Sequence, residues 1–127
     1  MKDWRDGDLA PATLGGQKLI LETAVSAAAA AQGLSGRASI PADGMLFVFP
    51  QAEIRYFWMK EMRFPLDIIW LKDQTIIGIT YSASVPPEQE REFPRAFYSI
   101  AEPSDMVIEV EAGRAVSFSR GMKLEIN

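Results

Sequence analysis

The 127-residue sequence contains no cysteine and no histidine. The lack of cysteine excludes disulfides and thiolate nucleophiles. The lack of histidine excludes serine–histidine and cysteine–histidine catalysis, the usual zinc sites and the usual proton shuttle near neutral pH. A metal would have to be a hard ion on oxygen ligands, and the acidic residues do not follow a calcium-loop pattern. We therefore predict no metal site and no cofactor.

The sequence also lacks an excess of positive charge. It has 13 Lys and Arg against 17 Asp and Glu, which leaves a net charge of −4. Binding to nucleic acid or to an anionic membrane without sequence preference needs a basic face, so this balance disfavours both. A local basic patch stays open, because Arg55, Lys60 and Arg63 lie close in the sequence. We expect no nucleic-acid partner and take a monomer as the default state.

Long hydrophobic runs are missing as well. No run approaches the roughly 20 apolar residues of a membrane span, and residues 1–8 contain no hydrophobic signal core. We expect no membrane span. A leader removed from the chain would leave no trace, so the compartment stays open. It is periplasmic or secreted if an export leader was removed, and cytoplasmic otherwise.

What is present fits an ordinary soluble globular domain. The hydrophobic content is 48%, and 127 residues suffice for one domain with its own core. Residues 1–16 are polar and contain Gly15 and Gly16, so we predict a flexible N-terminal segment with one short pairing segment near Leu9 or Leu14. Residues 17–127 are predicted to form a single α+β domain.

Residues 44–71 are the densest stretch of large apolar and aromatic side chains. We predict three strands here, with Pro50 and Pro65 at strand ends because proline cannot donate to a sheet ladder. Alternation along residues 66–71 places Asp67 on an otherwise apolar face, opposite Trp70. A charge beside a hydrophobic strip is either paired at a strand end or part of a site, and both readings stay open.

The other elements follow from local signals. Residues 17–22 and 106–110 are predicted strands, the second with Glu109 pointing outward. Thr23 is a predicted N-cap for an alanine-rich helix over residues 24–32. Further signals predict a tight turn at Asp73-Gln74, a bulge or close approach at Gly78, an irregular region over 82–97, a turn at Ser104-Asp105 and a last strand over 122–126. The sum is an α+β fold: a curved, mostly antiparallel, barrel-like β-sheet of about seven short strands with one Ala-rich helix packed on it.

Four sequence blocks resemble a known family. They are Gly33-Leu34-x-Gly36-Arg37, Gly44-Met45-Leu46-Phe47-Val48-Phe49-Pro50, Phe57-Trp58-Met59-Lys60 and Pro65-Leu66-Asp67-Ile68-Ile69. In this order they resemble the domain of unknown function family 192, also called uncharacterised protein family 0127, over about residues 17–126. The resemblance implies a small α+β domain with a barrel-like sheet, found in bacteria and archaea and often behind an export signal. It implies no reaction, because the family has no established activity.

The chain departs from the family pattern at two places. The Trp-Met-Lys block usually continues with Asn-Thr, whereas Glu61 and Met62 follow here. A segment of the form Ala-x-x-Val-Leu-Glu is replaced by residues 104–109. If the Asn-Thr pair contacts a ligand in relatives, that contact is altered in this chain.

The candidate ligand-binding site combines aromatic side chains with a few polar anchors, since apolar pockets with convergent polar groups are the usual form of small-molecule sites. Its predicted residues are Arg37, Trp58, Lys60, Asp67 and Trp70. The alternative is that these aromatic residues are simply core, which favours large rings for the same physical reason.

We predict a small-molecule binding or accessory module for a sugar-like or peptide-like ligand. One alternative is a hydrolase-type enzyme that uses Asp67 with Lys60 or Glu61, although no catalytic constellation is assembled in the sequence. Another is a protein-interaction domain that adds a strand to a partner. Whether the chain has any enzymatic activity stays open, with the balance against it.

Overall fold

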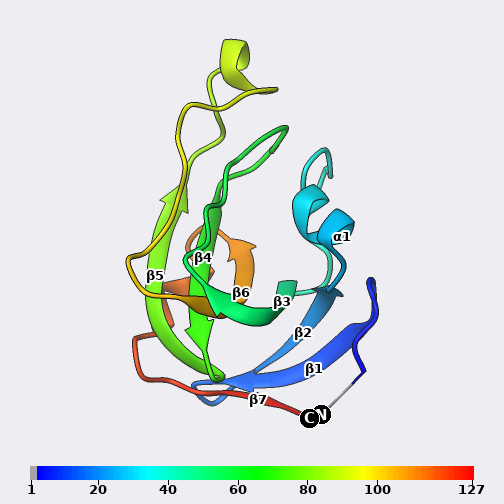
Figure 1. The fold of residues 1–127 in the computed structure, drawn as a ribbon, viewed down its shortest axis with the longest axis vertical. Helices are drawn as coiled ribbons and strands as arrows, with labels where there is room; N and C mark the ends of the chain where they lie inside the picture. Colours follow the sequence, from blue (N-terminus) through cyan, green and yellow to red (C-terminus); the bar gives the residue numbers. More distant parts are fainter. Residues whose placement is uncertain (1–2) are drawn as a thin grey trace.

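The computed structural model describes residues 3–127; residues 1 and 2, part of the segment predicted to be flexible, lie outside the described residues. The chain forms one seven-stranded sheet in the order β5-β4-β6-β3-β2-β1-β7, curled into a half-barrel (Figure 1). The strands are β1 (Leu9–Leu14), β2 (Gln17–Ala24), β3 (Gly44–Glu53), β4 (Leu66–Lys72), β5 (Thr75–Ala83), β6 (Ser104–Glu111) and β7 (Leu124–Ile126). Neighbours are antiparallel except β2 and β3, which pair in parallel. The predicted α+β class and curved, mostly antiparallel sheet are confirmed.

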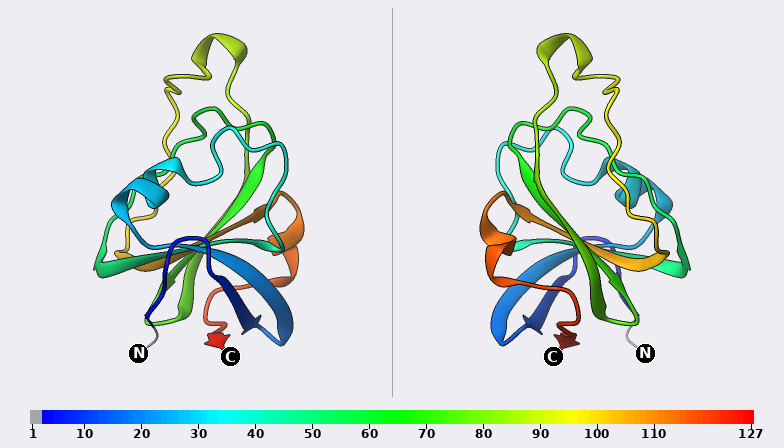
Figure 2. Two further views of the ribbon diagram at one scale, coloured as in Figure 1. Left: turned by 90° about the vertical axis from the view of Figure 1, so that its right-hand side faces the viewer. Right: turned by 90° about the vertical axis from the view of Figure 1, so that its left-hand side faces the viewer.

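The two outer strands, β5 and β7, meet at one end of the half-barrel. Thr75 and Lys123 form an isolated bridge, and the amide of Leu124 donates to the carbonyl of Gln74 at 2.7 Å. Long connections gather at the opposite end, among them the residues after β5 that rise above the rest of the molecule (Figure 2). The curl therefore leaves one end closed by pairing and the other end framed by loops.

Two hydrophobic clusters fill the fold, and β4 contributes to both. Ile69 and Leu71 belong to a first core with Leu21, Leu46 and Ile108. The alternate residues of β4, Leu66, Ile68 and Trp70, belong to a second core with Met45, Phe47 and Val107. The alternation predicted for residues 66–71 is thus confirmed, and both faces of this strand are buried.

The predicted strand over residues 54–60 is wrong. Its backbone pairs at one point only, where Phe57 and Tyr98 exchange hydrogen bonds of 2.8 and 2.7 Å. The reason is tertiary: β3 lies between β2 and β6, and β4 lies between β5 and β6, so neither strand has a free edge for residues 54–60. Pro50 lies inside β3 rather than at its end, within the shift of register between Val48 and Glu53, where no ladder bond is lost. Pro65 directly precedes β4, as predicted.

Helix α1 (Ala27–Gln32) is shorter than predicted and begins elsewhere. Its N-cap is Ser26, whose side chain accepts a hydrogen bond from the amide of Ala29 at 3.0 Å. Thr23 instead lies within β2, and its hydroxyl donates to the carbonyl oxygens of Arg5 and Asp8. Gly33 follows the helix, with a positive φ of 48°.

Several turn predictions are confirmed and one is wrong. Asp73 and Gln74 link β4 to β5 with φ values of 50° and 61°, which suits a two-residue hairpin. Gly78 follows a shift of register between β4 and β5 and lies against Ile100. Residues 104–105, predicted as a turn, instead begin β6. Two short 3₁₀ helices, η1 (Glu88–Glu90) and η2 (Arg114–Ser117), lie in the remaining connections.

The pairing segment expected near Leu9 or Leu14 is the strand β1, which spans both residues and pairs with β2 and β7. Residues 9–14 of the segment predicted to be flexible therefore pair with β2 along their whole length, and residues 12–14 also pair with β7. The domain boundary at residue 16 stays a prediction.

Candidate functional site

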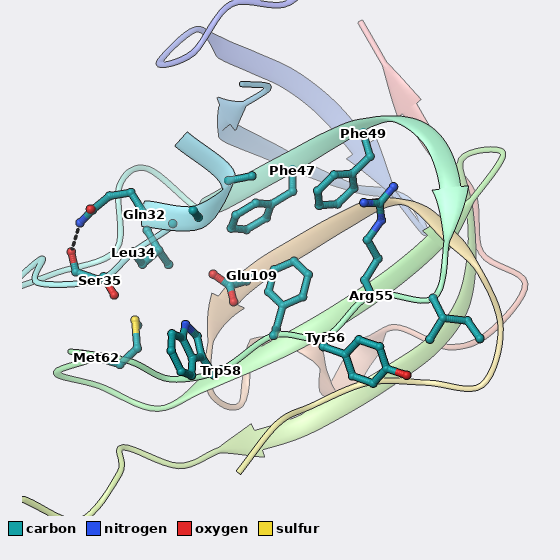
Figure 3. A pocket seen from close by; sticks show the side chains of 15 residues that line it. Gln32, Leu34, Ser35, Phe47, Phe49, Arg55, Tyr56, Trp58, Met62 and Glu109 are labelled. Atoms are coloured by element: carbon teal, nitrogen blue, oxygen red, sulfur yellow. Dashed lines mark hydrogen bonds between the residues drawn. The ribbon is translucent and has the colours of Figure 1, made fainter. Parts of the chain in front are cut away.

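A cavity of about 360 Å³ opens at the loop end of the half-barrel, between α1, β3 and the irregular segment before β4. We call it the aromatic cavity. Its walls are residues 30–35 and 54–58, together with Phe47, Phe49, Met62 and Glu109 (Figure 3). Rings from β3 and from the 54–58 segment face one another across it.

The rings of the aromatic cavity are held by one another and by the backbone. Phe57 packs edge to face against Phe47, with centroids 5.2 Å apart, and against Trp70, with centroids 5.4 Å apart. Its main chain is fixed by the bridge to Tyr98. Trp58 stacks on Phe97 at 5.5 Å. Contacts of this kind hold side chains in place without hydrogen bonds, so the wall is pre-organised for a ligand.

Glu109 is the acidic side chain of this wall. It lies on β6 between Met45 of β3 and Ile68 of β4 and is only 4% exposed. Figure 3 shows its carboxyl group directed toward the rings of Phe47 and Trp58. No hydrogen bond or ion pair to it is found within residues 3–127. Burial raises the pKa of Glu109 to about 8, because a carboxylate loses hydration there.

The prediction that Glu109 points outward is wrong. Residues 106–110 were expected to form a strand with one side toward solvent, but β6 is an inner strand with neighbours on both sides. The face of β6 that carries Glu109 is covered by the second core, so the Glu109 carboxyl group is buried. One sequence signal could have found it: the family resemblance aligns Glu109 with the acid that ends the Ala-x-x-Val-Leu-Glu segment.

Asp67 lies on the opposite face of β4 from Trp70 and does not line the aromatic cavity. It is 0% exposed. Its carboxylate accepts backbone N–H bonds from Ser82 at 2.8 Å, Gly113 at 2.9 Å and Ala115 at 3.1 Å. It thereby links the end of β5 to the start of η2. Lys60 forms no ion pair with it among the described residues.

The other predicted site residues are also dispersed. Trp70 is 0% exposed, and its ring N–H donates to the hydroxyl of Thr80 at 3.0 Å. Arg37 forms an ion pair with Glu22, with 2.7 Å between Nη2 and Oε2. Lys60 lines a neighbouring hollow together with Gly36 and Glu61. Its Nζ lies 5.6 Å from the Trp58 ring centroid. Of the five predicted residues, Trp58 is the one that lines the aromatic cavity.

Arg55 is the cation in the wall of the aromatic cavity, and sequence reasoning placed it only in a basic patch. Its guanidinium carbon lies 3.7 Å from the Phe49 ring centroid. Its N–H groups donate to the carbonyl oxygens of Ser104 and Gln51. These contacts direct its charge toward protein groups.

The departure from the family pattern at residues 61 and 62 has a structural counterpart. Met62 is buried in the wall of the aromatic cavity. Glu61 has a φ of 56°, in the left-handed region that asparagine adopts more readily than glutamate. The family's usual asparagine therefore suits the backbone of this turn, independently of any ligand.

This conformation leads to a prediction. Glu61→Asn is expected to raise the free energy of unfolding by about 0.5–1 kcal/mol, since asparagine tolerates the left-handed backbone at lower cost. Urea denaturation measures the change. Glu61→Ala is the matched control, because it removes the carboxylate but keeps a Cβ that disfavours this φ. An equal gain in both variants would show that the charge, not the backbone, is responsible.

The chemical repertoire of the site is narrow. Glu109 is the one carboxyl group among the residues that line the aromatic cavity, so a pair of acids is not assembled there. Residues 3–127 contain no group of three or more acidic side chains that could hold a metal ion. Within the same residues, no helix has the length and apolar character to cross a membrane.

Comparisons with known proteins agree with the fold. The family model DUF192, described as "Uncharacterized ACR", matches residues 10–126. A crystal structure from Sinorhizobium meliloti, described as a "putative transcription regulator", is similar with 28% identity, a TM-score of 0.82 and coverage of 98% of both chains. A protein of unknown function from Novosphingobium aromaticivorans has 27% identity and a TM-score of 0.77, covering 92% of this chain and 84% of its own. A comparison with curated proteins finds no match.

Proposed function

The chain belongs to the DUF192 family of uncharacterised proteins, and from this premise we propose that it is a small-molecule binding module whose site is the aromatic cavity. The ligand is of sugar-like or peptide-like size. Glu109, rather than Asp67, supplies the central polar contact. One observation carries the proposal: a carboxyl group that is 4% exposed and has no partner within residues 3–127 points into a cavity walled by rings.

The physical reason is the cost of such a group. Burying a polar group without a hydrogen bond costs about 1–3 kcal/mol in proteins. A ligand that bonds to Glu109 offsets this cost on binding, and its apolar part is buried against the rings of Phe47, Phe57 and Trp58. A volume of about 360 Å³ is within the usual range of small-molecule sites.

The geometry supports a binding module over a hydrolase. The hydrolase alternative needs Asp67 beside Lys60 or Glu61, but the carboxylate of Asp67 is sealed from solvent and occupied by three backbone N–H groups. Glycosidase chemistry needs two carboxyl groups across the substrate, and the aromatic cavity is lined by one.

The regulator description of the Sinorhizobium protein applies to that protein. For this chain, a net charge of −4 weighs against neutralising a phosphate backbone.

A thermal-shift screen tests the proposal. Wild type is scanned against sugars, amino acids, short peptides, nucleotides and organic amines. A ligand present at about 100 times its Kd is expected to raise Tm by roughly 5–15 °C, because it binds only the folded state. Trp58→Ala removes one wall of the aromatic cavity and is expected to abolish that rise.

Tyr81→Ala is the matched control, since this exposed aromatic residue of β5 does not line the aromatic cavity. It is expected to keep the full rise in Tm. A ligand whose effect survives Trp58→Ala binds elsewhere, and a screen with no Tm rise in any class contradicts the proposal.

A further inference from the structure

We propose that the ligand of the aromatic cavity is an organic cation, an ammonium group on an apolar body, whose charge lies against the carboxylate of Glu109. This inference rests on the proposed function and adds the chemical class of the ligand. A neutral sugar would use the same rings but would leave Glu109 without a counter-charge.

The first argument is the missing partner of Glu109. Its carboxyl group has neither a hydrogen bond nor an ion pair within residues 3–127. Arg55 is the cation among the residues that line the aromatic cavity, but its guanidinium is engaged by the Phe49 ring and by two carbonyl oxygens. The chain therefore supplies an acid to this cavity, and the one cation that lines the cavity is engaged by other groups.

The second argument is the nature of the walls. A cation over an aromatic face is attracted by the negative face of the ring, and the attraction grows when water is excluded. The rings at this end of the molecule already hold cations in this way. The Nζ of Lys60 lies 5.6 Å from the Trp58 centroid and 5.4 Å from the Phe93 centroid. A carboxylate enclosed by such rings combines the two features that recognise an ammonium group.

The third argument concerns the titratable groups around Glu109. The neighbouring positions on β3 and β4 are Met45 and Ile68, and α1 contributes alanines and Gln32. The segment 54–62 contributes Arg55 and Tyr56 to the wall, while Lys60 and Glu61 face the neighbouring hollow. Burial among these side chains raises the pKa of Glu109 to about 8, so its carboxyl group is protonated at neutral pH before a ligand binds.

Binding is then coupled to proton release. The protonated carboxyl group gives its proton to the buffer, and the resulting carboxylate pairs with the ligand cation. No covalent bond to the ligand forms or breaks. Below about pH 8 each binding event is expected to release close to one proton, and binding should tighten about tenfold for each pH unit from pH 6 to pH 8.

The experiment compares two matched pairs of probes by isothermal titration calorimetry. Choline is compared with its neutral isostere 3,3-dimethyl-1-butanol, and phenethylamine with 2-phenylethanol. The quaternary ammonium of choline does not titrate, so any pH dependence of its binding belongs to the protein. Titrations in two buffers of different ionisation enthalpy count the released protons. Wild type and Glu109→Gln are measured between about pH 6 and pH 9.

We expect at least one cation to bind wild type about tenfold or more tightly than its neutral partner, with proton release and the stated pH dependence. At about pH 8, Glu109→Gln should bind that cation about tenfold or more weakly than wild type, and its binding should not depend on pH. Phe97→Ala, which alters the outer side of Trp58, should keep the pH dependence and so separates loss of the charge from loss of packing.

Two results overturn the inference and are distinguishable. In the first result, the neutral partners bind as tightly as the cations, or neither cation binds while a neutral molecule gives a Tm rise that depends on Trp58. The ligand is then not a cation, but the aromatic cavity remains the proposed binding site. If neither the probes nor the wider screen bind, the proposed function falls as well.

Discussion

Asp67→Ala is expected to lower the free energy of unfolding by about 3–5 kcal/mol, the largest loss we expect from a single side chain outside the hydrophobic cores. The carboxylate of Asp67 accepts three backbone N–H bonds, from Ser82, Gly113 and Ala115. Alanine leaves these donors without an acceptor, and the one on Ala115 is fully buried. Urea denaturation at constant pH measures the loss.

A second carboxylate in the same fold provides the control. Asp43 accepts one backbone N–H bond, from Ile20 at 2.7 Å, and is partly exposed. Asp43→Ala is expected to cost about 1 kcal/mol, since it removes this bond and an exposed ion pair with Arg114 at 3.6 Å that contributes little. Equal losses at the two positions would contradict a structural role set by the number of bonds. Asp67→Asn keeps one acceptor oxygen, and because residue 67 is outside the aromatic cavity it should leave ligand affinity unchanged.

The free energy of unfolding is expected to fall as the pH rises from about 4.5 to about 8, and Glu109 is the cause. Burial raises the pKa of Glu109 from 4.5 to about 8 in the folded protein. Between these values the folded state holds a proton that the unfolded state has lost. Each pH unit therefore removes up to about 1.4 kcal/mol, and the full window on the order of 4 kcal/mol. The sign is opposite to that of a carboxylate stabilised in its ionised form.

Glu109→Gln isolates this effect. Glutamine has nearly the same shape and no charge, so the variant should be more stable than wild type at pH 8 and nearly equal to it at pH 4.5. Chemical denaturation at several pH values gives both curves. Hydrogen bonds to Ser26 and Val25 lower the pKa of Asp6, so that group acts at the acidic end, below the window of Glu109. A wild-type curve that rises from pH 5 to pH 8 would contradict the raised pKa.

Asp67 and Glu109 differ in the hydrogen bonds that their carboxyl groups accept. Both are buried, yet Asp67 meets three donors and Glu109 meets none within the described residues. A buried acid whose oxygens accept hydrogen bonds stabilises the fold, whereas a buried acid without partners lowers the stability of the ligand-free fold. The proposed ligand would supply the missing partner, and its binding would recover part of this lost stability.

Local signals in the sequence determined much of the architecture. The alternation of residues 66–71 predicted which side chains of β4 share a face, because side chains alternate along any strand whatever its partners. Asp73-Gln74 predicted a hairpin because the turn is a property of two adjacent residues. The ordered blocks around Phe57 and Asp67 identified the family, which the match over residues 10–126 bears out.

Only the tertiary structure decided which residues form the candidate site. A strand pattern does not say whether one face or both will be covered, and this depends on neighbours far away in the sequence. Because β6 lies between β3 and β4, Glu109 is enclosed by Phe47 and Trp58, and neither β3 nor β4 has a free edge that residues 54–60 could join. Asp67, the acid that the sequence made conspicuous, is sealed by amides more than ten residues away along the chain. Long-range pairing therefore decided which acid is structural and which one faces the cavity.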